Sequence, residues 1–145
     1  MKYGSNIKTA GPFGQNLRQI VEIATRKGDP IVLMTFSFYL PQDYTPEKFN
    51  SRSLDYSLHL VPVELWEQPE HVVATISKHN EVVREIAASY DRVIFVDQNR
   101  GIPKNGEYFN DIAHLTHKGS QWFVENLVSS LLLSKNVRLL YEQGR

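Results

Sequence analysis

The sequence predicts an α/β fold with a short parallel sheet. Two short apolar runs, "IVLMTFSF" and "VIFV", are rich in β-branched and aromatic residues, which is typical of strands buried on both faces. Amphipathic segments flank both runs, so the order along the chain is helix, strand, helix, strand, helix. This alternation is typical of parallel strands joined by right-handed helical crossovers.

The first helix is expected over residues 15–28, directly before the first strand. Its apolar positions 17, 20, 21 and 24 have the spacing of one helical face, and Lys27 followed by Gly28 is typical of a helix C-cap. Residues 29–38 contain the first apolar run and predict the first strand, so a tight turn joins the two elements.

Residues 40–69 lack a sustained period and contain four prolines, which interrupt regular helices and strands. We interpret this stretch as a long loop insertion at the surface with some short helix. Connections of this length in a compact domain are usually functional or mobile.

The second half of the chain repeats the alternation of helix and strand. Residues 70–91 predict an amphipathic helix, and residues 92–99 predict a second strand that ends in an acid and polar residues. Thr116 is a suitable N-cap for a last helix over residues 117–133. The apolar stripes lie at positions 72, 76, 83, 86, 87 and 90 of the earlier helix and at 123, 124, 127, 128, 131 and 132 of the last.

Length and composition indicate one packed domain over residues 1–145. Sixteen Lys and Arg residues balance sixteen Asp and Glu residues and occur singly, so no basic surface for nucleic acid is expected. The sequence contains no Cys, which excludes thiolate catalysis and cysteine-ligated zinc. No apolar run reaches the roughly 20 residues of a membrane-spanning helix. The first residues lack the apolar core of a signal peptide, so the expected location is cytoplasmic by default.

The stretch "FNDIAHLTHKGSQW" holds the candidate catalytic residues Asp111 and His114 at the start of the last helix. An acid three residues before a histidine can accept a hydrogen bond from Nδ1–H, which fixes the tautomer and leaves Nε2 as a general base for a serine hydroxyl. Two other interpretations stay open. Asp111 can simply favour the N-terminal end of the helix dipole, or it can bind a metal ion together with His114 and His117.

A general base of this kind requires a nucleophile, and the sequence offers two weak candidates. Ser5 lies in "YGSN", which no strand precedes. Ser37 lies at the carboxyl end of the first strand but lacks the glycine-permitted sharp turn that exposes a nucleophile. His59, His71 and His79 lie in the insertion or along the second helix, where structural roles are expected.

Residues 79–131 resemble the C-terminal half of the SGNH, or GDSL-type, hydrolase family. In that family a strand ending in Val-Asp is followed by a loop, then by Asp-x-x-His, a glycine and the last helix. The matching parts here are "FVD", Asp111, His114 and Gly119. Residues 16–38 resemble the preceding helix and strand of the family, so the resemblance covers roughly residues 13–133.

The resemblance implies a three-layer α/β/α fold and hydrolysis of an ester or acyl group, with His114 as base and then acid and Asp111 as its orienter. It implies a small-molecule ester or acylated carbohydrate as substrate, and no cofactor or metal ion. The family's Gly-Asp-Ser segment and Gly-x-Asn-Asp block are not found in this sequence. We therefore expect an incomplete domain that is inactive alone, and either an N-terminal-half partner or a homo-oligomer. The alternative is a non-catalytic binding module that keeps the fold.

Overall fold

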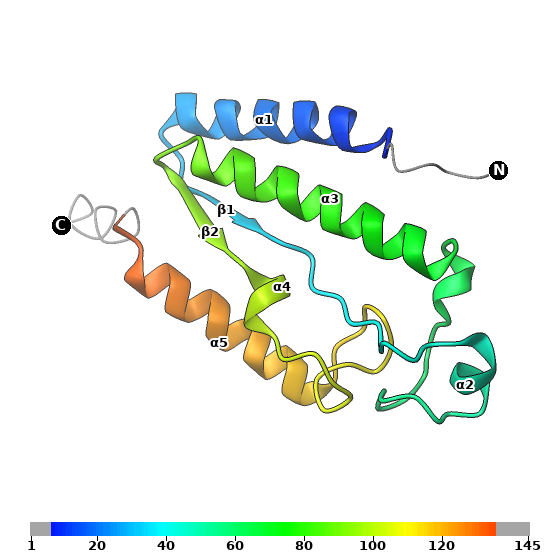
Figure 1. Cartoon of the computed structure of the whole chain (residues 1–145). Coiled ribbons are helices and arrows are strands. Elements are labelled where there is room, and N and C mark those ends of the chain that lie inside the picture. The colour runs from blue at the N-terminus through cyan, green and yellow to red at the C-terminus, as the bar shows by residue number, and fades with distance from the viewer. Residues whose placement is uncertain (1–6, 136–145) are drawn as a thin grey trace.

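The computed structural model describes residues 7–135 and shows an α/β fold with a two-stranded parallel sheet (Figure 1). In chain order its elements are α1 (Ala10–Lys27), β1 (Ile31–Met34), α2 (Pro46–Asn50), the 3-10 helix η1 (Val63–Leu65), α3 (Pro69–Ala88), β2 (Val93–Val96), α4 (Gln98–Gly101) and α5 (His117–Leu133). The predicted order of helix, strand, helix, strand, helix is confirmed by α1, β1, α3, β2 and α5.

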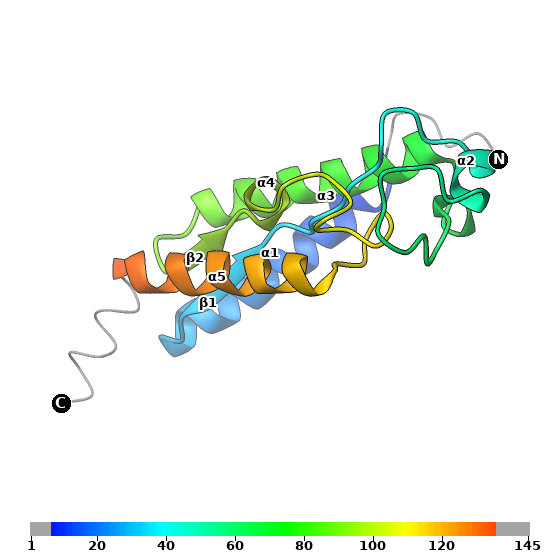
Figure 2. The same ribbon diagram turned by 90° about the horizontal axis from the view of Figure 1, so that it is seen from below.

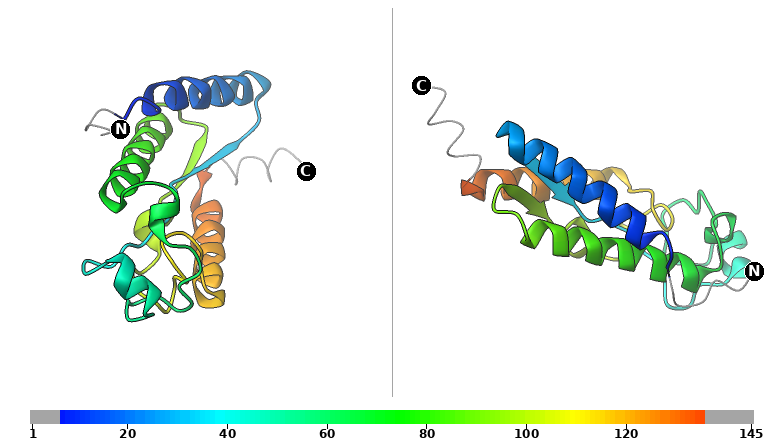
Figure 3. Two further views of the ribbon diagram at one scale, coloured as in Figure 1. Left: turned by 90° about the vertical axis from the view of Figure 1, so that its right-hand side faces the viewer. Right: turned by 90° about the horizontal axis from the view of Figure 1, so that it is seen from above.

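The two strands lie parallel and in register from the pair Ile31 and Val93 to the pair Met34 and Val96. Helix α3 is the crossover between them and packs beside α1 on one face of the sheet (Figure 1, Figure 3). Helix α5 lies on the opposite face, where it runs in front of β2 when the molecule is seen from below (Figure 2). Helices therefore form the two outer layers and the sheet forms the middle one.

The main core lies between the sheet and the pair of helices α1 and α3. Leu33 of β1 is buried there against Val21 of α1 and against Val83 and Ile86 of α3. Gly28 ends α1 with φ 78°, a left-handed conformation that glycine adopts readily, so the chain turns sharply into β1. The predicted C-cap is confirmed.

Helix α1 begins at Ala10, earlier than the apolar pattern predicts. Ala10 is buried, and Gly14 lies so close to α3 that an added Cβ would be 3.1 Å from Val82 Cγ1. The first turns of α1 therefore pack through small residues, which an apolar periodicity does not detect.

Both strands are shorter than predicted because polar side chains form hydrogen bonds with the main chain just beyond them. Asn80 of α3 binds Phe36: its Oδ1 accepts from the Phe36 N–H and its Nδ2 donates to the Phe36 carbonyl, both at 2.8 Å. β1 accordingly ends at Met34. β2 ends at Val96 because the Asp97 side chain caps the short helix α4.

The expectation that both strands are buried on both faces is wrong. Met34 of β1 and Phe95 of β2 are 39% and 36% exposed, since α5 packs mainly on β2 and leaves part of the sheet uncovered. The predicted apolar stripe of α5 is also only partly covered, and Val124, Val128 and Leu132 are exposed. Within residues 7–135, no helix is both long enough and apolar enough to cross a membrane.

Residues 40–69 contain α2 and η1 and contribute buried side chains of their own. These side chains pack against the segment that follows β2 and against the start of α3. The buried members are Phe49, Leu54, Tyr56, Ile102, Tyr108 and Phe109 in one cluster and Val63, Val72 and Ile112 in the other. The insertion is therefore built against the turn that carries the candidate site.

Candidate functional site

The candidate site is a tight irregular turn just before α5. Phe109 and Leu115 form an isolated antiparallel bridge, so the chain reverses direction between them. Asn110 closes the turn twice, because its N–H donates to the His114 carbonyl at 2.7 Å and its Nδ2 donates to the Leu115 carbonyl at 2.9 Å. The turn is thereby a fixed support for the side chains of Asp111 and His114.

Asp111 points into the protein and is fully buried. Its Oδ1 accepts hydrogen bonds from the main-chain N–H groups of Ala113 and His114, both at 2.9 Å. Its Oδ2 accepts from the N–H of Val61 at 3.0 Å, so the insertion helps to hold the acid. A buried carboxylate is tolerated only when its oxygens are satisfied in this way.

His114 binds the same carboxylate and points outward. Its Nδ1 lies 2.8 Å from Asp111 Oδ2 and 3.0 Å from Oδ1, and 54% of its side chain is exposed. An ionised carboxylate only accepts hydrogen bonds, so Nδ1 carries a proton and Nε2 is the nitrogen that can accept one in the neutral ring. The structure thus brings the two predicted residues together in an arrangement suited to a general base and its orienting acid.

His117 is the first residue of α5 and does not join this pair. Thr116 caps the helix as predicted, since its Oγ1 accepts from the Gly119 N–H at 3.0 Å. In the part of the chain that the structure describes, no group of three metal-binding side chains comes together. The interpretation in which Asp111, His114 and His117 bind a metal ion is therefore not supported by the geometry.

The two serines considered as nucleophiles have different outcomes. Ser5 lies outside the described residues. Ser37 follows β1, is buried, and accepts a hydrogen bond from Lys104 Nζ at 3.0 Å. Ser37 is therefore paired with a lysine and not with His114.

The remaining histidines have contacts that serve packing. His79 packs edge-on against Phe13 and its Nδ1 contacts a main-chain carbonyl of α3 at 2.8 Å. At the start of α3, His71 Nδ1 lies 3.8 Å from Glu67 Oε1. His59 packs against two aromatic rings of the insertion. None of the three lies in the candidate turn.

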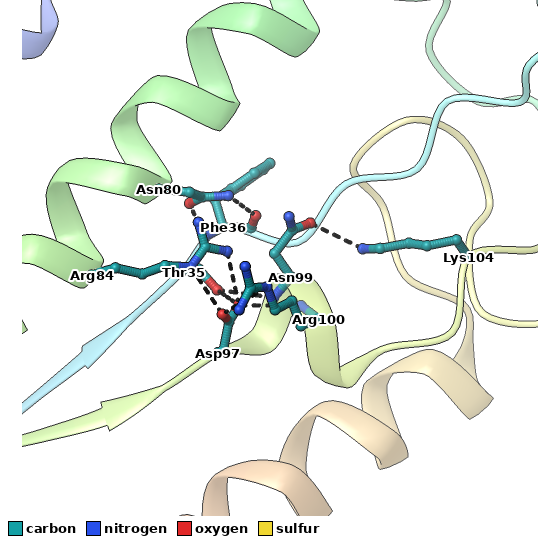
Figure 4. Close-up of polar contacts among 8 residues, drawn as sticks. All are labelled: Thr35, Phe36, Asn80, Arg84, Asp97, Asn99, Arg100 and Lys104. Atoms are coloured by element: carbon teal, nitrogen blue, oxygen red, sulfur yellow. Dashed lines mark hydrogen bonds and ion pairs between the residues drawn. The ribbon is translucent and has the colours of Figure 1, made fainter.

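A polar cluster that sequence reasoning missed joins the carboxyl ends of the two strands (Figure 4). Asp97 accepts from Arg84 Nε at 2.9 Å, from Arg84 Nη2 at 3.2 Å and from the Thr35 hydroxyl at 2.8 Å. Burial raises the pKa of Asp97, but the hydrogen bonds from Arg84 and Thr35 outweigh it, so this pKa lies below its usual range. The sequence showed the acid at the end of the strand but not its partners.

Lys104 lies beside this cluster, in the loop that leads to the candidate turn (Figure 4). Its ammonium donates to Ser37 Oγ at 3.0 Å and to Asn99 Oδ1 at 3.1 Å, and it lies 5.0 Å from the centre of the Phe109 ring. Burial lowers the pKa of Lys104 to about 8, against a smaller opposing effect of Asp97. A single lysine in a loop carries no signal in the sequence.

The candidate turn and the polar cluster both follow the carboxyl ends of parallel strands, where α/β proteins bind ligands. Comparison with family models, curated proteins and solved structures finds no significant match to this chain. We therefore infer its function from the geometry of Asp111 and His114 and from the motif that contains them.

Proposed function

We propose that this chain supplies the general base and its orienting acid to an ester hydrolase of the SGNH type. His114 removes the proton from an attacking serine hydroxyl and returns it to the leaving alcohol. Asp111 holds the Nδ1–H tautomer and stabilises the imidazolium. The supporting observation is a buried carboxylate 2.8 Å from Nδ1 of a half-exposed imidazole. The proposed substrates are small-molecule esters or acylated carbohydrates.

A purely structural role accounts for Asp111 but not for His114. The carboxylate of Asp111 holds three main-chain N–H groups, and that task needs no imidazole. An exposed partner adds little to stability, because solvent screens its interactions. The outward-facing ring on a buried acid therefore favours proton transfer over a role in folding alone.

The nucleophile and the oxyanion hole are proposed to come from another segment. Within residues 7–135, the serine after β1 is hydrogen-bonded to Lys104 and not to His114. A segment bearing the family's Gly-Asp-Ser sequence, in the same polypeptide or in a partner chain, would supply the missing groups. We expect this chain alone to hydrolyse chromogenic esters no faster than its His114→Ala variant, since most of the rate depends on a positioned nucleophile and oxyanion hole.

The test supplies a Gly-Asp-Ser segment, by fusion or as a second chain, and measures hydrolysis of a chromogenic ester. We expect activity to appear, and His114→Ala to remove nearly all of it, because His114 is the imidazole that the buried carboxylate of Asp111 orients as a proton acceptor. His117→Ala is the matched control, since this histidine lies three residues further on and outside the pair. It should retain nearly full activity.

Two outcomes would contradict the proposal. One is a folded, reconstituted protein without esterase activity, which would favour the binding module. The other is an equal loss in His117→Ala and His114→Ala, which would remove the special role of the Asp111 and His114 pair.

A further inference from the structure

Among residues 7–135, the direct hydrogen-bond partners of the Lys104 ammonium are neutral groups. Its ammonium donates to Ser37 Oγ and Asn99 Oδ1, and the rings of Phe38 and Phe109 lie 5.8 Å and 5.0 Å away. A lysine usually keeps its ammonium in water or beside a carboxylate. The residue as a whole is exposed at the surface, while its ammonium is partly buried.

The acids near Lys104 already have other partners. Asp97 accepts from Arg84 at 2.9 Å and lies 3.7 Å from Arg100 Nε. Asp55, which faces the same loop from the insertion, accepts from a main-chain N–H of that loop at 3.0 Å. Three cationic side chains, Arg84, Arg100 and Lys104, therefore lie near the carboxyl ends of the strands, and the carboxylates of Asp97 and Asp55 are already engaged, which favours the approach of an anion.

We propose that Lys104, Ser37 and Asn99 bind an oxyanion, the carboxylate or phosphate group of a ligand. The ammonium has three N–H groups and uses two of them in the contacts described, so a third can be donated. Ser37 accepts from Lys104, so its hydroxyl proton can also be donated. Asn99 Nδ2 is a further donor beside them. Charge-assisted bonds to an anion would offset the desolvation of the ammonium.

This inference deepens the proposed function and rests on it for the identity of the substrate. Phe109 begins the turn that carries His114, and the Lys104 ammonium lies 5.0 Å from its ring centre. An oxyanion held by Lys104 therefore lies beside the residue that begins the turn carrying the candidate base. On this basis the substrate is an ester that also carries a negatively charged group.

The test follows anion binding by NMR in the chain itself, without any turnover. Inorganic phosphate and, separately, acetate are titrated at pH 7 and constant ionic strength, and the amide signals of Ser37 and Asn99 are recorded. We expect saturable shifts with at least one anion, and the comparison shows whether phosphate or carboxylate is preferred. Lys104→Met, which keeps an apolar stem, should weaken binding at least about tenfold, and Lys104→Arg should preserve it in part.

Lys118→Met is the matched control. Lys118 also lies 5.0 Å from an aromatic ring, that of Tyr108, but it forms an ion pair with Glu107. This variant should bind the anion as the wild type does. The proposal is overturned if neither anion gives a saturable shift, or if Lys104→Met binds as tightly as Lys118→Met. If the chain binds an anion but the reconstituted protein has no esterase activity, the anion site stands and the proposed hydrolase function is contradicted. If esterase activity appears but no anion binds, the anion site alone is contradicted.

Discussion

At the scale of single residues, the carboxylate of Asp111 has two tasks. It holds the His114 ring at 2.8 Å, and it accepts three main-chain N–H groups, one of them from Val61 in the insertion. An amide at this position would satisfy fewer of these donors, because its nitrogen donates and does not accept. The carboxylate is therefore needed for the conformation of the turn as well as for the tautomer of the His114 ring.

We expect Asp111→Asn to lower the free energy of unfolding by roughly 1–3 kcal/mol, the range for a buried polar group left unpaired. His114→Ala should change it by less than about 0.5 kcal/mol, because substitutions of exposed side chains cost little. Urea denaturation followed by circular dichroism compares the two variants. Equal losses would mean that the contact between the carboxylate and the imidazole, and not the bonds to the main chain, stabilises the turn.

His59 predicts a pH dependence of stability. Its backbone has φ 54°, and its buried Nε2 has no hydrogen-bond partner among residues 7–135. Burial, followed by the positive charge of Arg52, lowers the pKa of His59. The unfolded chain, with a His pKa of about 6.5, binds the proton more readily, so stability falls as the pH drops below that value.

The measurement compares the unfolding free energies of the wild type and His59→Asn between about pH 7.5 and about pH 5.5. Asn does not titrate in this range and tolerates a positive φ. We expect the wild type to lose stability relative to the variant as the pH falls. A difference that stays constant with pH would show that His59 keeps an ordinary proton affinity in the fold.

The pair of Asp111 and His114 could be predicted from the sequence because its members lie three residues apart on one turn. The contact of Lys104 with Ser37 and that of Val61 with Asp111 could not, since 67 and 50 residues separate the partners. Such contacts depend on how distant segments pack, and no local pattern reports them.

At the scale of elements, the first turn of α5 is fixed to the loop before it. Thr116 caps the helix, and its Oγ1 also donates to the Glu107 carbonyl at 2.6 Å. Gly119 lies so close to Tyr108 that an added Cβ would overlap the Tyr108 carbonyl oxygen. These contacts therefore fix the position of the first turn of α5, which follows His114 in the chain.

Gly119→Ala should lower the free energy of unfolding by roughly 1–3 kcal/mol. The added Cβ has a fixed position and would overlap the Tyr108 carbonyl oxygen, a main-chain atom that cannot move aside easily. Gly11→Ala in α1 is the matched control: an added Cβ there meets no atom within 4 Å. This control should be neutral or stabilising by up to about 1 kcal/mol, since Ala favours helix. Thermal unfolding measures both, and similar midpoints would show that α5 does not need this close approach.

The order of the main elements could be predicted from the sequence, but their ends could not. Asn80 ends β1 by binding the main chain of Phe36, and Asp97 starts α4 directly after β2. Each end is set by a polar side chain whose hydrogen bonds to the main chain compete with the next hydrogen bond of the sheet. Apolar periodicity does not detect such competition.

At the scale of the whole molecule, a sheet of two strands leaves much apolar surface open. Two strands seldom form an independently stable sheet, and an open strand edge with apolar side chains tends to pair with another chain. The exposed apolar residues on the strands, just after β1 and on α5 are Met34, Phe36, Phe95, Trp122, Val124, Val128, Leu132 and Leu133. The sequence could not show this exposure, because it follows from which faces the helices cover.

We expect the purified chain to self-associate through the edge of β1 and the exposed stripe of α5, and to bind a dye that reports apolar surface. Val128→Lys, in the middle of that stripe, should shift the mass measured by light scattering toward the monomer. Ser129→Lys adds the same charge at an exposed polar neighbour and should not. A monodisperse wild-type monomer with cooperative unfolding and no dye binding would contradict this expectation.

The central inference is that Asp111 fixes His114 in the tautomer that leaves Nε2 as the proton acceptor. Nitrogen-15 NMR of the imidazole rings, with the His114 signals assigned by their loss in His114→Ala, measures this state directly in the neutral ring. We predict a protonated Nδ1 and an unprotonated Nε2 in the wild type, and a loss of this preference in Asp111→Asn. A wild-type ring with its proton on Nε2, or a preference that survives Asp111→Asn unchanged, would contradict the inference.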